Sequence, residues 1–243
     1  MIPDQNTTPL RVPMPRAVAV IEHLIASVLL EAASPSAVPA DQAETGPAPT
    51  LTFTPTPAPR PVIIGITGPV GSGKSYLASL LTSCVLSWDD YLPNYDHIPE
   101  AERDLPHHAD LDRLLADLSA LRQNATALVP TWSFHTHARS GERKLDPKPV
   151  VVCEGLHALH PHIAALIDIS VFVEADSLAR WARWEYNELT GVRGWGVEKA
   201  KAFFTSVADP TFALYAEQYR SRADLIVTNN DFRPPPPAPH EPV

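Results

Sequence analysis

The segment that most constrains this chain is Gly68–Ser75, because its residues match the pattern G-x-x-x-x-G-K-[ST] at every fixed position. The apolar, β-branched run Val62–Thr67 precedes it and predicts a buried parallel strand, and residues 76–81 follow with helical spacing. In this strand–loop–helix context the loop N–H groups and the helix N-terminus bind phosphate. The predicted nucleotide-binding residues are Gly68, Pro69, Val70, Gly71, Ser72, Gly73, Lys74, Ser75 and Tyr76. Lys74 is expected to face the β- and γ-phosphates, and Ser75 to offer an oxygen to Mg²⁺.

Length and charge limit the classes of partner. The 243 residues can form one domain with a full core, and the net charge of -9 argues against nucleic-acid or anionic-membrane partners. Cys84 and Cys153 lie in apolar runs, so we expect buried thiols in a reducing cytosol and a cytoplasmic protein.

The 27 prolines concentrate outside a central region, which divides the chain into four segments. Residues 1–33 form an N-terminal segment with one amphipathic helix at 16–33; this helix is too short and too charged to span a membrane, and we expect it to pack on the domain or on a partner. Residues 34–61 are predicted to be a Pro-rich linker, 62–230 the domain that contains the Gly68–Ser75 loop, and 231–243 a Pro-rich, disordered tail.

Strand-like and helix-like segments alternate through 62–230. Apolar runs predict strands at 84–88, 150–153, 167–173 and 224–228, and leucine spacing predicts a helix from Asp110 to Leu121. Residues 128–149 suggest a small hairpin, and 177–189, 197–208 and 211–220 look helical. The fold class is therefore α/β, a parallel sheet of about five strands flanked by helices, with a β-hairpin and a helical lid.

Acidic side chains follow two of the predicted strands. Asp89 and Asp90 come after the strand at 84–88, and Glu154 follows 150–153. Ligands of open parallel sheets bind beyond the carboxyl ends of strands, so both positions suit chemistry. Phosphoryl transfer needs a phosphate cradle, a metal and a proton acceptor; Ser75 and Glu154 can hold Mg²⁺, and Asp89 can accept a hydroxyl proton. Each acid could instead be an ordinary cap or strand-end residue.

These segments resemble the uridine kinase and phosphoribulokinase group of P-loop kinases, and are most similar to uridine–cytidine kinases. The shared stretches, in order, are Gly68–Ser75, Ser87–Tyr91, Asn94–His97, Phe134–Arg139, Val152–Gly155 and Ala223–Val227. The resemblance covers about residues 61–230 and implies a five-stranded parallel core beside a small hairpin.

The resemblance also implies roles for the acceptor side. It makes Asp89 the general base, places Asp96 on ribose hydroxyls, and puts His137 at the base with Arg139 nearby. Uridine kinases usually carry Tyr-Asp where this chain has Trp132-Ser133, so Trp132 is expected to stack on an acceptor that a tyrosine hydroxyl would otherwise read. In the arginine-poor lid, Arg183 and Arg193 are the candidate catalytic cations, whereas Trp184, Asn187 and Trp195 lie where further arginines are expected.

The sequence thus predicts a P-loop kinase that uses ATP or GTP with Mg²⁺ and phosphorylates a small molecule, foremost the 5′-hydroxyl of a nucleoside. A kinase of the same group acting on a sugar phosphate, pantothenate or glycerate is one alternative, and a nucleotide-binding regulatory protein without transferase activity is another. No nucleic acid or membrane partner is expected, and a homo-oligomer is compatible with the sequence. The histidines, including His107 and His108, match no closed zinc pattern, so no structural metal is predicted.

Overall fold

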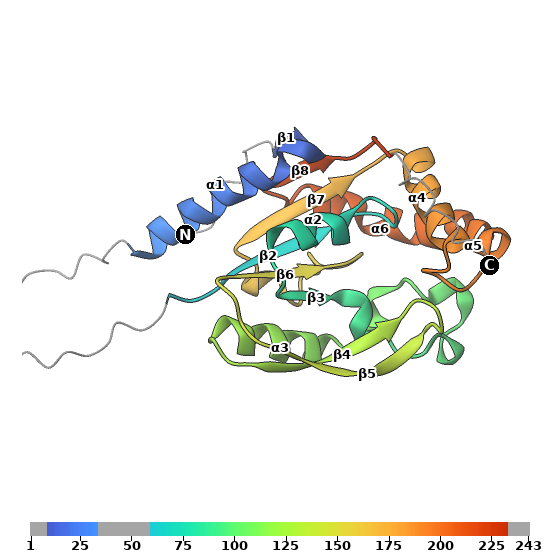
Figure 1. The fold of residues 1–243 in the computed structure, drawn as a ribbon, viewed down its shortest axis with the longest axis horizontal. Coiled ribbons are helices and arrows are strands. Elements are labelled where there is room, and N and C mark those ends of the chain that lie inside the picture. Colours follow the sequence, from blue (N-terminus) through green and yellow to red (C-terminus); the bar gives the residue numbers. More distant parts are fainter. Residues whose placement is uncertain (1–8, 34–58, 233–243) are drawn as a thin grey trace, which may run out of the picture.

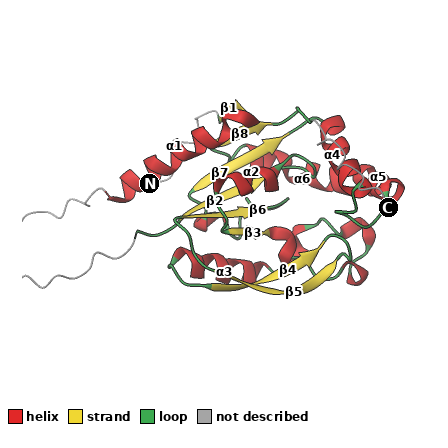
Figure 2. Cartoon of the chain, in the orientation of Figure 1, coloured by secondary structure: helices red, strands yellow, loops and turns green. Residues whose placement is uncertain are grey.

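The computed structural model describes residues 9–33 and 59–232. The strands are β1 (Leu10–Pro13), β2 (Val62–Thr67), β3 (Val85–Ser87), β4 (Ala127–Ser133), β5 (Ala138–Leu145), β6 (Val150–Glu154), β7 (Ile169–Glu174) and β8 (Leu225–Thr228). The α-helices are α1 (Met14–Ala33), α2 (Lys74–Leu81), α3 (Leu111–Arg122), α4 (Ser177–Leu189), α5 (Val197–Phe203) and α6 (Asp209–Arg220) (Figures 1 and 2). The α/β class predicted from the sequence is confirmed.

A six-stranded parallel sheet in the order β1-β8-β7-β2-β6-β3 forms the centre of the molecule. Five of these strands were expected; the sixth is β1, which pairs with β8 at the edge, in the register Leu10↔Leu225. The hairpin β4–β5 is antiparallel and lies beside the sheet, below β3 in Figure 1.

The strands are buried on both faces, which is why they read as continuous apolar runs. In β2, Val62, Ile64 and Ile66 pack with α1 and α2 on one face, whereas Ile63 points into the core under α3 and the hairpin. A third cluster joins α6 to β7 and β8. Cys84 and Cys153 are free and buried, as expected.

The N-terminal helix packs on the sheet. Ala17 and Ile21 of α1 are fully buried in the cluster beneath α2, so the expectation that this helix packs on the domain is confirmed. The strand β1 directly precedes α1 and pairs with β8. Residues 10–33 are therefore part of the same folded domain as the central sheet. The division into four segments stays a prediction, and most of the linker (34–58) and the tail (233–243) lie outside the described residues. Among the described helices none is both long and apolar enough to cross a membrane.

Helix ends and irregular turns shape the carboxyl edge of the sheet. Asp110 caps α3 by accepting the N–H of Arg113 at 3.2 Å. Trp88, expected at the end of a strand, instead begins the 3₁₀ turn Trp88–Tyr91, which bends the chain away from β3 directly before Asp89. The helix expected at 197–208 widens into a π turn at Phe204–Ala208 before α6.

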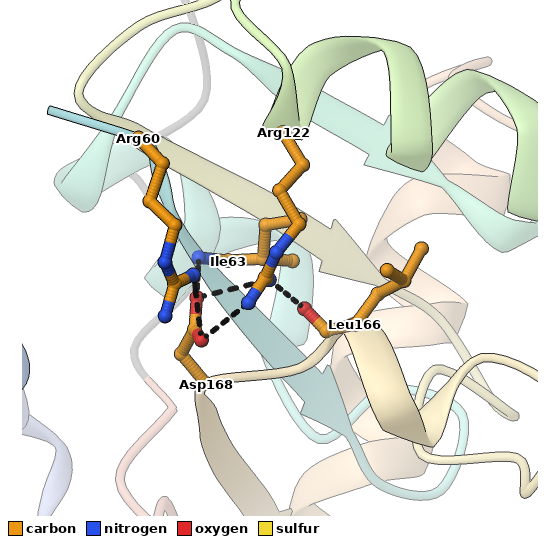
Figure 3. A network of polar contacts seen from close by, with 5 residues as sticks. All are labelled: Arg60, Ile63, Arg122, Leu166 and Asp168. Carbon is orange, nitrogen blue, oxygen red and sulfur yellow. Dashed lines mark hydrogen bonds and ion pairs between the residues drawn. The ribbon is translucent and has the colours of Figure 1, made fainter. Parts of the chain in front are cut away.

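One carboxylate ties the opposite, amino-terminal edge together. Asp168, just before β7, accepts from the N–H of Ile63 at 2.9 Å, from Arg60 at 3.0 Å and from Arg122 of α3 at 2.9 Å (Figure 3). Arg122 also donates to the carbonyl of Leu166 at 2.6 Å. Charge-assisted bonds of this kind fix β2, β7 and α3 relative to one another at the edge away from the phosphate loop.

Candidate active site

The phosphate loop joins β2 to α2 and needs its glycines. Gly68 and Gly73 adopt φ values of 151° and 101°, which L side chains rarely reach. A Cβ on Gly68 would lie 2.1 Å from the carbonyl oxygen of Val173, and one on Gly73 would lie 2.4 Å from the side-chain nitrogen of Asn229. Asn229 closes the loop from β8 by donating to the carbonyl of Ser72 at 2.8 Å. The predicted loop therefore has the conformation that its sequence pattern implies.

Lys74 begins α2 and turns back over this loop. Its ammonium group donates to the carbonyl of Pro69 at 3.1 Å, and the side chain is buried. Burial lowers the pKa of Lys74, while the carboxylates of Glu154 and Asp89 oppose the shift. A cation held in a dry pocket between two acids is suited to phosphate oxygens that carry migrating charge.

Ser75 and Glu154 meet at the same edge. The Ser75 hydroxyl donates to Oε1 of Glu154 at 3.2 Å across the α2–β6 junction. Burial raises the pKa of Glu154 to about 7, and Lys74 limits the rise. Two hard oxygen ligands, one of them a buried carboxylate that a cation would ionise, fit the requirements of Mg²⁺.

The two neighbouring aspartates after β3 have different surroundings. Asp89 lines the cavity; burial raises its pKa, and Lys74 and Arg193 oppose that shift. Asp90 points to the hairpin, where it accepts the N–H of Trp132 at 2.8 Å and lies 3.8 Å from Arg143. Of the two, only Asp89 therefore lines the cavity, whereas Asp90 anchors the hairpin.

The two lid arginines also differ. The Arg193 guanidinium is buried over the rings of Phe134 (4.7 Å) and Trp184 (4.6 Å). Burial lowers the pKa of Arg193, and the negative charge of Asp89 opposes this shift. Arg183 lines the cavity near the loop and donates to the carbonyls of Gly71 (2.8 Å) and Asn229 (2.6 Å). Arg193 thus lies among the aromatic rings within electrostatic reach of Asp89, whereas Arg183 braces the phosphate loop.

His137 lies at the other end of the cavity, at the tip of the hairpin, with a φ of 54°. Its ring stacks on Trp195 at 4.3 Å with an interplanar angle of 11°, and on Tyr95 at 5.7 Å. Burial lowers the pKa of His137 to about 4, so the ring is neutral at pH 7 and offers one donor and one acceptor.

Three predicted acceptor residues do not line this cavity. Trp132 is 9% exposed, packs beneath Tyr95 at 5.1 Å, and its indole nitrogen has no hydrogen-bond partner among the described residues. The Asp96 side chain is 76% exposed and faces a separate hollow of about 280 Å³. Arg139 donates to the carbonyls of Leu92 (2.9 Å) and Tyr91 (3.0 Å), which holds the turn after β3. Their acceptor roles stay predictions.

Sequence reasoning missed three residues that the cavity contains. Tyr95 and Trp195 flank His137, and Asp104 is a buried carboxyl whose pKa burial and Asp89 raise to about 7. Tyr95 donates its hydroxyl to Asp104 at 3.4 Å. Tyr95 belongs to the Asn94–His97 stretch, so the resemblance could have pointed to it. Asp104 lies in a polar segment without hydrophobic periodicity, where the sequence carries no signal.

The phosphate loop, Asp89, the two lid arginines and the rings around His137 line one cavity of about 800 Å³. Its walls include most of the phosphate loop, with Lys74, Ser75 and Tyr76, and then Asp89, Glu154, Asp104 and the aromatic rings of the lid and hairpin. Such a volume suits two small molecules held end to end. A parallel sheet with a phosphate loop, a buried acid at the next strand end and a lid arginine defines a P-loop phosphotransferase.

The chain belongs to the Phosphoribulokinase / Uridine kinase family, whose sequence profile matches residues 96–232. The chain is 30% identical over 186 residues to a uridine kinase of Brevibacillus brevis, and the aligned region covers 71% of this chain and 86% of that protein. A uridine kinase of Ligilactobacillus salivarius is 30% identical over 182 residues, covering 69% and 85%. The fold is similar to that of a solved structure from Silicibacter sp. TM1040 described as a candidate fructose transport system kinase, with a TM-score of 0.58 and 20% identity, covering 84% and 98%. The protein is therefore a P-loop small-molecule kinase of an ATP-dependent family.

Proposed function

We propose that this kinase transfers the γ-phosphoryl group of ATP to the 5′-hydroxyl of a nucleoside. The observation that carries the proposal is the single cavity in which Lys74 and Asp89 face a wall made of Tyr95, His137 and Trp195. Stacked flat rings at one end of a kinase cavity suit a flat base, and a neutral imidazole beside them suits a base edge. The similarity to two uridine kinases supports the same acceptor class.

Asp89 is the proposed general base. Its raised pKa makes it a stronger base than an ordinary carboxylate, and Lys74 and Arg193 keep its anion accessible. The acceptor oxygen forms a bond to the γ-phosphorus while the bond from that phosphorus to the β–γ bridging oxygen breaks. The hydroxyl proton passes to Asp89 and ADP leaves. Lys74 and Arg193 stabilise the charge that spreads over the transferring group.

Ser75 and Glu154 are the proposed Mg²⁺ ligands, directly or through water. When bound, the ion neutralises charge on the β- and γ-phosphate oxygens. Ionised Glu154 is the form that binds a cation, so its pKa of about 7 implies proton release when the metal–nucleotide complex binds below that pH.

Charge at the acceptor end favours a neutral acceptor. Asp104 and Asp89 supply two acids there, and the two cations of the described cavity lining that act on them, Lys74 and Arg193, are the ones assigned above to the transferring phosphoryl group. Arg103 and Lys199 lie in the separate hollow behind the Tyr95–His137 wall. A sugar phosphate, pantothenate or glycerate would bring a negative charge toward two carboxyls, which costs free energy. We propose that Asp104 binds acceptor hydroxyls, a role that the sequence assigned to Asp96.

We propose ATP, rather than GTP, as the phosphoryl donor and the cytoplasm as the location of the protein. A homo-oligomer stays a prediction.

The decisive experiment incubates the purified protein with Mg·ATP and, separately, uridine, cytidine, adenosine, guanosine, pantothenate, glycerate and ribulose 5-phosphate, and identifies the product by phosphorus NMR. We expect a nucleoside 5′-monophosphate. Turnover of an anionic acceptor without turnover of any nucleoside would overturn the proposal, and ATP binding without any turnover would favour the regulatory alternative.

A further inference from the structure

A loop outside the cavity gathers three metal-ligand side chains. Glu102, His107 and His108 bring a carboxylate oxygen and two imidazole nitrogens within 4.8 Å of one another. Nε2 of His108 lies 3.2 Å from Oε2 of Glu102, and the two imidazole rings are 4.2 Å apart. Among the residues that the structure describes, no other three side chains of this kind come so close together.

The donor set selects a class of ion. Two imidazoles and one carboxylate suit Zn²⁺ and similar first-row metals, whereas Mg²⁺ and Ca²⁺ prefer oxygen ligands alone. In a tetrahedral zinc site with bonds of about 2.0–2.2 Å, neighbouring ligand atoms lie roughly 3.3–3.6 Å apart. The Glu102–His108 separation of 3.2 Å is close to this edge, and the His107 nitrogen lies within 4.8 Å of both of these atoms. His107 is exposed and the other two side chains are half-buried, so an ion and a completing water can reach them.

The loop backbone is held in place without a metal. The N–H of Leu105 donates to the carbonyl of Glu102 at 2.9 Å, and the N–H of Ala109 donates to that of Pro106 at 3.2 Å. Pro106 opens the short 3₁₀ turn Pro106–His108, which fixes the start of the turn that carries both histidines. Ligands on a preformed loop lose less entropy on binding than ligands on a free chain.

An ordinary ion pair accounts for only part of this cluster. His162 and Asp112 form such a pair elsewhere on the surface, also at 3.2 Å, and no described residue adds a third ligand beside them. In the cluster, an ion pair between His108 and Glu102 does not explain the position of His107. The His107 ring contacts that of His108, and its side chain forms no hydrogen bond or ion pair within the described residues. From these three side chains we propose that Glu102, His107 and His108 form a binding site for one Zn²⁺ or similar divalent transition-metal ion.

The site is joined to the cavity through Asp104, which lies between its ligands in the sequence. The carbonyl of Asp104 accepts Nε2–H of His157 at 2.8 Å, and Nδ1 of that ring accepts the hydroxyl of Tyr219 at 2.9 Å. A metal ion would hold the loop on both sides of Asp104. It should therefore restrict this carboxyl and tighten acceptor binding, a consequence that rests on the proposed function.

The binding test needs no turnover. Full-length protein, freed of metal with a chelator and kept in excess Mg²⁺ to occupy oxygen sites, is titrated with Zn²⁺ by calorimetry and with Co²⁺ by visible absorption. We expect one ion per chain and the absorption of a tetrahedral cobalt site. The His107→Ala and Glu102→Gln variants should each weaken binding about tenfold or more, and the matched control His162→Ala should bind like the wild type.

Stability and kinetics complete the test. Zn²⁺ at about 100 times the wild-type Kd should raise the Tm of the wild type by roughly 5 °C, and that of His107→Ala by about half as much or less. Equal Tm values of all variants without metal show that they are folded. Binding that is absent, or that is lost equally in His162→Ala, overturns the site. Binding that leaves the acceptor KM of the wild type unaltered overturns the link to Asp104, and a failed acceptor assay bears on the proposed function alone.

Discussion

The two ends of the cavity are built in different ways. At the nucleotide end, one continuous segment, Gly68–Ser75, forms the cradle with its backbone. At the acceptor end, Tyr95, Asp104, His137 and Trp195 come from four separate places in the chain, and their side chains form the wall. A backbone-made site needs glycines at fixed spacing and is therefore visible in a sequence. A site made of side chains depends on how distant segments pack.

Removing the Lys74 cation should have the largest effect. Lys74→Ala should lower kcat by about 10³-fold or more, because charge that develops on the transferring group loses its nearest positive partner. Steady-state ATP turnover with the best nucleoside measures this loss. Lys144→Ala, which removes an exposed lysine paired with Asp146, is the control and should behave like the wild type. Retention of most activity in Lys74→Ala would mean that the loop is not the phosphate site.

The aspartate pair separates chemistry from anchoring. Asp89→Asn should lower kcat by about 10²–10⁴-fold with ATP affinity unchanged, as expected for the loss of a general base. Asp90→Asn should mainly lower the Tm, since it weakens the anchor on the N–H of Trp132. Rates and calorimetric ATP affinities of both variants check the assignment, and a reversed pattern would make Asp90 the base.

Asp104 and Asp96 compete for the same role at the acceptor end. Asp104→Asn should raise the acceptor KM roughly tenfold, because the acceptor hydroxyls lose a buried carboxylate partner. The ATP KM should be unaltered, because Asp104 lies at the acceptor end of the cavity. Asp96→Asn, an exposed position in the neighbouring hollow, should change the acceptor KM less. A larger effect at Asp96 would show that the loop rearranges when the acceptor binds.

The pKa of Asp104 predicts a pH dependence of stability. Folding raises this pKa from 3.8 to about 7, so the contribution of Asp104 to stability is complete below about pH 4 and is lost as the pH rises through 7. Asp104→Asn removes this loss, and its Tm relative to the wild type should rise by roughly 5 °C between pH 5 and pH 8. Melting curves of the two proteins that run parallel over this range would show that the carboxyl is not buried as described.

The smallest effect is expected at Trp132. Because its ring lies beneath Tyr95 and does not reach the cavity, Trp132→Tyr should change the ratio of kcat/KM for uridine and cytidine by less than about twofold. The measurement uses both nucleosides on both proteins. A larger change in selectivity would show that this position reads the base, as its place in the sequence suggests.

The local hydrophobic pattern and the glycine spacing were enough to predict the fold class and the phosphate loop. The runs that became β2, β6, β7 and β8 are apolar because both faces of the sheet are covered, so they stand out in the sequence. The strand β1 does not stand out: Leu10–Pro13 is short and mostly exposed, and only pairing with β8 makes it a strand. Arg139 illustrates the limit for side chains, since nothing local indicates that its guanidinium binds the carbonyls of Tyr91 and Leu92. Asp104 enters the cavity through turns that have no periodic signature.

The pairing of β1 with β8 has a consequence for biosynthesis. Val12 accepts a hydrogen bond from Thr228, 216 positions later in the chain, so one edge of the sheet joins the first described strand to the last. A ribosome delivers β1 before β8, so β1 must wait without its partner while the more than 200 residues between them are made. Contacts of such high sequence separation form late, because a long loop must close before they gain any free energy. The nascent chain thus exposes the unpaired backbone groups of β1 until β8 has been made, and a chain that stops before β8 lacks the strand with which β1 pairs.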